Sequence, residues 1–157
     1  MNTIITGELH SGKTTKAAEI VSGIPGCGGF LSKPVFTGGK LCGYDLHFIE
    51  SEVSAPFIRT METADPEEPV RYALDKYRFY ERTFAKAETL LAQYCGRNMP
   101  AVLVDEMGIL ECRKQGFYEP VKKLISGGAE LITCVRRTCL DAIVSMLPLE
   151  DVRIIEV

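Results

Sequence analysis

Two glycines, a lysine and a threonine between positions 7 and 14 have the spacing of a phosphate-binding loop. These residues read Gly7-Glu8-Leu9-His10-Ser11-Gly12-Lys13-Thr14, which fits the Walker A pattern G-x-x-x-x-G-K-T. In such a P-loop the glycines allow a tight turn, and backbone N–H groups point at a phosphate. Lys13 supplies a positive charge for the terminal phosphates, and the Thr14 hydroxyl supplies an oxygen for magnesium. We predict a nucleotide-binding loop that runs from Gly7 to Thr15.

A strand is predicted before this loop and a helix after it, as a phosphate-binding loop requires. Residues 3–6 are a short apolar run in which a buried strand would end, and residues 14–21, rich in Ala, Lys, Glu and Ile, favour a helix. The positive end of that helix would face the bound anion. We expect the His10 side chain to point into solvent, with a contact to nucleotide or to a neighbouring subunit as the alternative.

Two adjacent carboxylates follow a second apolar run. Residues 100–104 read Pro-Ala-Val-Leu-Val and lead into Asp105 and Glu106, whose side chains strand alternation would send in opposite directions. Taken alone, the pair would simply start a loop or cap a helix. In a P-loop protein the first acid of such a pair is the Walker B acid, so we expect Asp105 to hold magnesium near Thr14. Glu106 is then free to deprotonate an attacking water as a general base.

An arginine near the transferring phosphoryl group would stabilise the charge that develops in the transition state. Arg136 and Arg137 follow a predicted strand at the end where open parallel sheets bind ligands. We predict that one of them completes the catalytic site, with Arg136 ahead of its neighbour. Arg113 and Lys114, just beyond the acidic pair, are the next candidates, and a solvated charge pair is the alternative.

Length and composition indicate an ordinary globular protein. The chain has 157 residues, of which 46% are hydrophobic and 25% charged, so we predict one domain over residues 1–157. No run of eighteen apolar residues occurs, and the N-terminus lacks the basic patch and the long apolar core of a signal peptide. We therefore expect a cytoplasmic protein without a membrane partner.

Charge and cysteine spacing argue against two other classes of function. The net charge is −3, and the basic residues form only isolated pairs such as Lys122-Lys123, so we expect no nucleic-acid partner. The six cysteines form no C-x-x-C pair and have no histidine at ligand spacing, so a zinc site is not predicted. Cys134 lies in an apolar run and is expected to be a buried small hydrophobe, although folding could still bring two cysteines together.

The first half of the chain favours strands after its first helix. Residues 26–36 and 40–49 are predicted to form a hairpin that turns at Thr37-Gly38-Gly39, and residues 56–60 a third short strand. Two prolines within residues 65–69 indicate a surface loop. A helix is predicted over residues 79–94. Its buried stripe is formed by Phe84, Ala87, Leu90, Leu91 and Tyr94.

The second half alternates between short apolar strands and helices. Strands are predicted at residues 101–104, 130–135 and 152–157, and helices at residues 117–126 and 138–147. This alternation is typical of a parallel sheet with helices on both faces. We therefore predict an α/β protein with a mostly parallel sheet, to which the hairpin is an antiparallel addition.

These residues resemble the small thermophile-type nucleoside-triphosphatases, also described as nucleotide-kinase-related. Besides the P-loop, the resemblance rests on paired glycine-aromatic segments, a Phe ahead of a helix, an acidic signature similar to D-E-I-G-x-M-E, and a final strand. These features are Gly29-Phe30-Leu31 with Gly43-Tyr44-Asp45, then Phe84, residues 105–111 (Asp-Glu-Met-Gly-Ile-Leu-Glu), and residues 154–157. The resemblance implies a RecA-like P-loop domain. It also implies magnesium-dependent hydrolysis of nucleoside 5′-triphosphates such as ATP and GTP to diphosphates, with loose preference among bases.

The chain departs from the family's pattern at three places. The P-loop has Glu8, Leu9 and His10 where the family usually has Pro and Gly. Residues 32–35 read Ser-Lys-Pro-Val where the family usually has a Thr-Glu-Val/Ile and Arg stretch. Members usually continue past the last strand into an Asn-Arg segment, whereas this sequence ends at Val157.

Three functions fit these residues. The first is a nucleoside-triphosphatase in which Glu106 activates water. The second is a small-molecule or nucleotide kinase, which normally has an arginine-rich lid; Arg71, Arg78 and Arg82 instead lie along a predicted surface loop and helix. The third is a nucleotide-binding switch or assembly module with little turnover. We take the first as the leading hypothesis.

Overall fold

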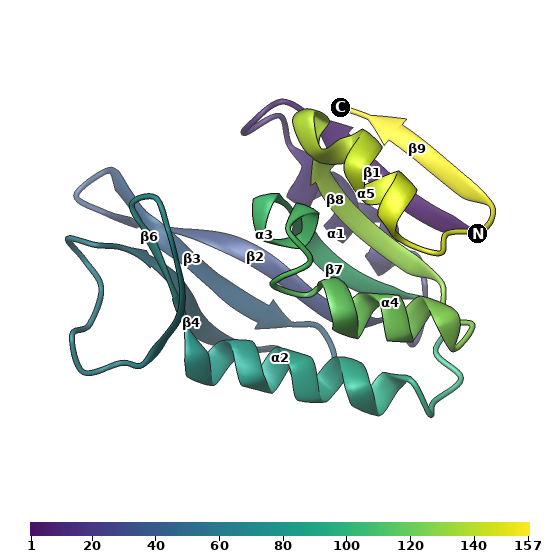
Figure 1. The fold of residues 1–157 in the computed structure, drawn as a ribbon, viewed down its shortest axis with the longest axis horizontal. Helices are drawn as coiled ribbons and strands as arrows, with labels where there is room; N and C mark the ends of the chain where they lie inside the picture. Colours follow the sequence, from purple (N-terminus) through teal and green to yellow (C-terminus); the bar gives the residue numbers. More distant parts are fainter.

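The structure, a computed structural model, describes residues 1–157 and is built on one nine-stranded sheet (Figure 1). The strand order is β5-β6-β4-β3-β2-β7-β8-β1-β9. In chain order the strands are β1 (Asn2–Gly7), β2 (Gly28–Thr37), β3 (Lys40–Phe48), β4 (Val53–Thr60), β5 (Val70–Leu74), β6 (Tyr77–Tyr80), β7 (Val102–Met107), β8 (Leu131–Arg136) and β9 (Val152–Glu156). The helices are α1 (Lys13–Ser22), α2 (Glu81–Tyr94), α3 (Ile109–Cys112), α4 (Tyr118–Ser126) and α5 (Leu140–Met146), with one 3-10 turn, η1 (Arg137–Cys139).

The parallel half of the sheet positions the two predicted motifs. Its strands run in the order β2-β7-β8-β1-β9, and each neighbouring pair is parallel. The P-loop follows β1 and the acidic pair lies in β7, so one strand, β8, separates them. The carboxyl ends of these strands meet at one edge, which brings both motifs to the same end of the sheet.

The antiparallel half is larger than the sequence predicts. The predicted hairpin is present as β2 and β3, and its turn residues Gly38 and Gly39 both have positive φ, as a tight two-residue turn requires. The third strand is also present as β4, but a second hairpin, β5 and β6, adds two strands that were not predicted. Arg71 and Arg78 therefore lie in strands, and the expectation that they lie along a surface loop and helix was wrong.

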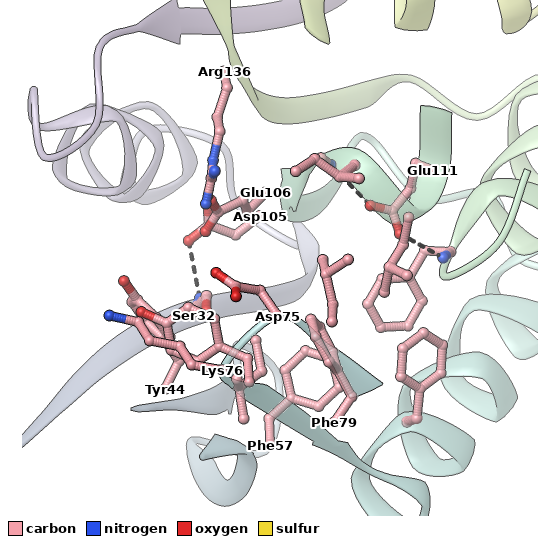
Figure 2. A pocket seen from close by; sticks show the side chains of 18 of the residues that line it. Ser32, Tyr44, Phe57, Asp75, Lys76, Phe79, Asp105, Glu106, Glu111 and Arg136 are labelled. Carbon is pink, nitrogen blue, oxygen red and sulfur yellow. Dashed lines mark hydrogen bonds and ion pairs between the residues drawn. The ribbon is translucent and has the colours of Figure 1, made fainter. Parts of the chain in front are cut away.

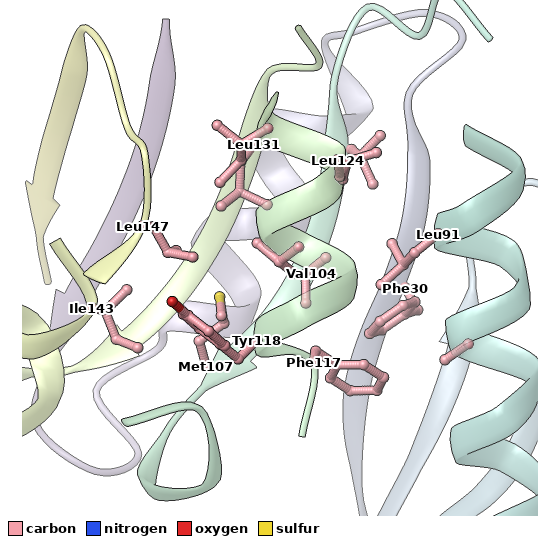
Figure 3. Packing of buried hydrophobic residues seen from close by; sticks show 14 of the residues in the cluster. Phe30, Leu91, Val104, Met107, Phe117, Tyr118, Leu124, Leu131, Ile143 and Leu147 are labelled. Atoms are coloured by element: carbon pink, nitrogen blue, oxygen red, sulfur yellow. The ribbon is translucent and has the colours of Figure 1, made fainter. Parts of the chain in front are cut away.

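Helices cover both faces of the sheet, as predicted. Helix α1 packs on one face, where Ala17 and Val21 join a buried cluster with Ile5 and Leu103. Helices α2, α4 and α5 cover the other face over a larger buried cluster (Figure 3). The sheet therefore supplies apolar side chains to two cores, one on each side.

Helix α2 carries the predicted stripe but begins later than predicted. Phe84, Ala87, Leu91 and Tyr94 are buried, and Leu90 packs partly buried against the same cluster. The predicted helix began at residue 79, whereas Phe79 and Tyr80 belong to β6. The sequence pattern also placed Phe84 ahead of a helix, whereas it lies inside the first turns of α2.

We expect Leu91→Ala to destabilise the fold strongly. The Leu91 side chain is fully buried in the larger core, and truncating such a residue costs about 2–5 kcal/mol because a cavity is left behind. Thr89→Ala on the exposed face of the same helix is the matched control and should change stability by less than about 0.5 kcal/mol. Urea unfolding of both variants measures the difference, and an equal stability of the two would contradict the packing described here.

The longest helix, α2, has 14 residues, and none of the helices could span a membrane.

Candidate active site

The P-loop connects β1 to α1 as the motif requires. Gly12, the residue before the helix, has φ 96°, a left-handed conformation that glycine adopts without strain. The Lys13 side chain is buried and folds back over the loop, where its Nζ donates hydrogen bonds to the carbonyl oxygens of Glu8 (2.7 Å) and Gly7 (3.4 Å). The lysine thus lies against the turn in which a phosphate would be held. His10 is exposed and also has positive φ.

Asp105 reaches the P-loop across the sheet. The Thr14 hydroxyl donates a hydrogen bond to Asp105 Oδ2 at 3.0 Å, and the Ser32 backbone N–H donates to the same oxygen at 2.9 Å. Burial raises the pKa of Asp105, against hydrogen bonds from Ser32, Cys134 and Thr14 that lower it. The expected proximity of Asp105 and Thr14 is therefore present. The strand was predicted to end at residue 104, but β7 continues to Met107, so both acids lie within it.

The donor atoms around Asp105 fit a magnesium ion. Asp105 Oδ1 is buried without a hydrogen-bond partner, and so are Thr6 Oγ1 and Ser11 Oγ. A carboxylate and a hydroxyl are hard oxygen ligands, which magnesium prefers, and the ion usually takes its remaining ligands from phosphates and water. No group of three or more His, Cys, Asp and Glu side chains is arranged to hold a metal. Thr14 and Asp105 are thus the residues that fit the ion.

Glu106 has an unusual backbone conformation. Its φ is 60°, and the pairing of β7 with β8 shifts register between Val104 and Met107, so simple strand alternation does not continue through Glu106. A non-glycine residue held in the left-handed region costs about 1–3 kcal/mol, and residues with such strain cluster at functional sites. The Glu106 carboxylate is half-buried and accepts a hydrogen bond from Arg136 Nε at 3.3 Å.

The two adjacent arginines have different surroundings. Arg136 ends β8 and lies beside Glu106, as Figure 2 shows. Arg137 instead pairs with Glu8 of the P-loop at 3.2 Å and with Glu156 of β9 at 2.5 Å. The structure therefore places Arg136 against the predicted general base, whereas its neighbour ties the loop to an edge strand.

Glu111 holds the segment after β7. Its carboxylate is buried and accepts hydrogen bonds from the backbone N–H groups of Gly108 (2.8 Å) and Phe117 (2.9 Å). Burial raises the pKa of Glu111, and these two hydrogen bonds lower it. A Cβ on Gly116 would lie 1.8 Å from the Glu111 carboxylate, so only glycine fits there. Glu111 thus positions the backbone just beyond Glu106.

A cavity of about 720 Å³ opens beside these groups (Figure 2). The P-loop contributes Leu9 and His10 to its lining, and Asp105, Glu106 and Arg136 lie in the same wall. Arg113, a secondary candidate from the sequence, also lines it, whereas Lys114 does not. Volumes of 300–1,000 Å³ are typical of small-molecule sites.

Three contributors to the site had not been predicted. Ser32 acts through its backbone N–H, so no side-chain pattern could reveal it. Tyr44 lines the cavity, and the pKa of its phenol is raised by burial and next by the charge of Glu106. The β5–β6 hairpin contributes residues 73–77 to the lining. The segment Gly43-Tyr44-Asp45 was noted only as part of the family resemblance, and no role in the site was predicted for Tyr44.

A Walker A loop between β1 and α1, facing an acid on β7 in this strand order, defines a P-loop NTPase fold. The sequence pattern of a family described as NTPase matches residues 2–157. The chain belongs to this family, so the predicted resemblance and the predicted fold class are confirmed, and the protein is an NTPase enzyme.

Known relatives are similar along most of the chain. It is 22% identical over 138 residues to nucleoside-triphosphatase THEP1 of Thermotoga petrophila, covering 88% of this chain and 73% of that protein. The Thermotoga maritima protein of the same name matches at 22% identity, with 75% of its length covered. Two solved structures share the fold. A human cancer-related nucleoside triphosphatase has a TM-score of 0.68 and 24% identity, and the match covers 99% of this chain and 88% of that one. THEP1 from the hyperthermophile Aquifex aeolicus has a TM-score of 0.73 and 17% identity, and the match covers 99% of this chain and 89% of that one.

Proposed function

We propose that this protein hydrolyses nucleoside 5′-triphosphates to diphosphate and phosphate with magnesium, and accepts several bases. The observation that carries the proposal is the meeting of three groups at one end of the sheet: the P-loop, the buried Asp105 carboxylate bound to Thr14, and Glu106 beside Arg136. NTP hydrolysis in general is supported by the family. The residue roles below are assigned from the geometry.

The phosphates are held by the loop residues Gly7 to Thr15. Backbone N–H groups of a P-loop point at the phosphates, and the positive end of α1 faces them. On nucleotide binding, Lys13 Nζ exchanges its two carbonyl partners for phosphate oxygens, which carry more negative charge. Thr14 and Asp105 are the residues that would hold magnesium, and the ion would neutralise charge on the terminal phosphates.

Hydrolysis requires a base beside the terminal phosphate. The Glu106 carboxylate accepts a proton from the attacking water, whose oxygen forms a bond to the γ-phosphorus while the bond to the leaving diphosphate breaks. Arg136, already paired with this carboxylate, orients it, and its charge would stabilise the negative charge that develops on a phosphoryl group held beside Glu106. The constrained backbone of Glu106 keeps the carboxylate in place.

Broad base specificity follows from the groups assigned to binding. The loop, Lys13, Thr14 and Asp105 are all assigned to the phosphates or to the magnesium ion bound to them. Every nucleoside triphosphate carries the same phosphates. ATP, GTP and the pyrimidine triphosphates would therefore bind through the same contacts, and the base would add little discrimination.

A panel of nucleoside triphosphates tests this proposal. We expect phosphate release from several bases in magnesium buffer and none after magnesium is removed with EDTA. Tight nucleotide binding without phosphate release would instead favour a nucleotide-binding switch, and release confined to one base would contradict broad specificity.

Asp105→Asn should raise the magnesium requirement. The amide keeps the size of the side chain but removes the negative charge. Loss of a group that only orients a metal's ligands weakens metal affinity by about 10–100-fold, so a fall of at least this size is expected for a residue that holds the ion. Phosphate release titrated with magnesium measures the shift of the half-saturation point. Asp151→Asn is the control, because this exposed acid precedes β9 at the end of the parallel strands opposite the P-loop. An unchanged titration in Asp105→Asn would remove Asp105 from the metal site.

We further propose that residues 1–157 act as one domain in the cytoplasm. One continuous sheet joins both halves of the chain, and all six cysteines are free thiols, which suits a reducing compartment.

A further inference from the structure

The P-loop carries a negative charge of its own. Glu8 is the only acid between Gly7 and Thr15, and Lys13 is the only lysine or arginine in the same stretch. The Glu8 side chain is 75% exposed. A nucleoside triphosphate would bring further negative charge to this loop, and like charges repel. If Glu8 were unpaired, its charge would therefore oppose the attraction of Lys13 for the phosphates.

Arg137 pairs with this carboxylate from outside the loop. It follows β8 at the start of η1, where its Nη1 lies 3.2 Å from Glu8 Oε1 and its Nη2 lies 2.5 Å from Glu156 Oε1. Neither carboxylate forms an ion pair with any other cation. Arg137 is therefore the single cation that neutralises the acid of the loop.

The register of three strands explains why one arginine reaches both acids. In the sheet, β8 and β9 lie on either side of β1, as Figure 1 shows. Gly7, the last residue of β1, is level with Arg136 of β8, so Glu8 and Arg137 both come one residue later. On the other side, β9 brings Glu156 level with the residue before Gly7. The guanidinium thus joins the two strands that flank β1 at the point where the P-loop begins.

This ion pair acts on the electrostatic field at the loop more than on the stability of the fold. Exposed ion pairs contribute little to stability because water solvates both charges. A charge close to bound phosphates acts differently, because it changes the potential that the ligand meets. Pairing also fixes where the Glu8 carboxylate lies, since Arg137 is itself held by Glu156 of β9. An unpaired Glu8 would be free to approach the phosphates.

We propose that Arg137 is a positioning residue for nucleotide binding, which neutralises Glu8 and holds its carboxylate toward β9 so that the phosphates meet Lys13 without an opposing charge. Arg137 acts through Glu8 and needs no contact with the nucleotide. Its neighbour Arg136 instead pairs with Glu106, so the two adjacent arginines have separate tasks. The inference rests on the proposed function, because it requires a nucleotide in the P-loop.

A double-mutant cycle between Arg137 and Glu8 tests the assignment, with binding of ADP and magnesium measured by isothermal titration at low salt. Arg137→Met keeps an apolar stem but removes the charge, and it should weaken binding by about three- to tenfold. Glu8→Gln should tighten binding by at most about twofold when Arg137 is present. In the Arg137→Met protein the same change should tighten binding by about three- to tenfold and restore the wild-type affinity.

Two results of this cycle would overturn the proposal. An unchanged affinity in Arg137→Met would show that the pairing has no effect on the nucleotide. Equal effects of Glu8→Gln in both backgrounds would show that the two charges act on the phosphates independently. Arg153→Met is the matched control, because this exposed arginine of β9 forms no ion pair, and it should bind ADP as the wild type does.

Salt separates an effect of charge from a damaged loop. The Debye length falls from about 10 Å at 0.1 M salt to about 3 Å at 1 M, so exposed charges interact weakly at the higher concentration. The affinity ratio between wild type and Arg137→Met should therefore shrink to less than about twofold at 1 M sodium chloride. A ratio that persists there would indicate a distorted loop and overturn the role of charge.

Phosphate release from ATP distinguishes a failure of this inference from a failure of the proposed function. Arg137→Met should raise KM by about three- to tenfold and change kcat by less than about twofold, because Glu106 and Arg136 keep their pairing. A fall in kcat at constant KM would place Arg137 at the transferring phosphoryl group and overturn the positioning role. If wild type hydrolyses ATP but the cycle shows no coupling, the positioning role alone fails. A wild-type protein that binds no nucleotide would overturn both.

Discussion

Glu106→Gln should bind nucleoside triphosphate at least as well as the wild-type protein and lose about 10²–10⁴-fold in the rate of phosphate release. Glutamine keeps the shape of the side chain but cannot accept the proton of the attacking water, and a positioned general base typically contributes an effect of this size. Binding should persist because the loop and Lys13 are untouched. It should even strengthen if Arg136, freed from its partner at 3.3 Å, turns to the phosphate.

Single-turnover phosphate release and nucleotide titration of the same preparation measure the two quantities separately. Glu119→Gln, at an exposed acid in the first turn of α4, is the matched control and should behave as wild type. Unimpaired hydrolysis in Glu106→Gln would exclude Glu106 as the base. Loss of binding together with hydrolysis would instead show that the carboxylate holds the nucleotide complex together.

Lys13→Ala should reduce turnover by at least about a hundredfold and weaken nucleotide binding. The lysine is the buried cation of the P-loop, and hydrogen bonds to charged groups contribute about 1.5–3 kcal/mol each. A preorganised charge at the transferring phosphate adds a further effect on the transition state. Isothermal titration with a nucleoside diphosphate and a phosphate-release assay measure the two losses.

Lys16→Ala is the matched control for this variant. Lys16 lies one turn further along α1 and is paired with Glu19 on the helix surface, so its loss should leave binding and turnover unchanged. Thermal unfolding of Lys13→Ala shows whether the loop has collapsed, since Lys13 also bridges two carbonyl oxygens of the loop. Full activity in a folded Lys13→Ala protein would contradict the P-loop assignment.

The strain at Glu106 links the fold to the proposed chemistry. A regular strand would continue past Asp105 with alternating side chains, but the register shift and the left-handed Glu106 interrupt it. Glu111 secures the next turn by binding the Gly108 backbone. The acidic signature in the sequence thus encodes three acids with different tasks: Asp105 at the P-loop, Glu106 at the cavity and Glu111 within the supporting backbone.

Local sequence patterns were sufficient for the elements whose chemistry is local. The P-loop depends on the spacing of Gly7, Gly12, Lys13 and Thr14 within one turn, so its position between a strand and a helix could be predicted. The alternation of strands and helices after Pro100 predicted the parallel half of the sheet because the apolar runs of β7 and β8 are buried on both faces, whereas β9 is a largely exposed edge strand. The hairpin at Gly38 could also be predicted locally, because its turn needs residues that tolerate positive φ.

Long-range pairing decided the rest. The β5–β6 hairpin alternates weakly and sits at the sheet edge, so no local period revealed it, and the helix was predicted to start too early at Phe79. Ser32 joins the site through a backbone N–H, 73 residues away from Asp105 in sequence, and a backbone group leaves no trace in residue type. The cavity exists only because segments far apart in the chain, from the P-loop to the end of β8, surround it. The sequence by itself therefore determined the P-loop and the acidic pair, which are short motifs, and it already singled out Glu106 and the two arginines Arg136 and Arg137. The tertiary structure decided which of these arginines lies beside Glu106 and which backbone group binds Asp105, because those depend on contacts between residues far apart in the chain.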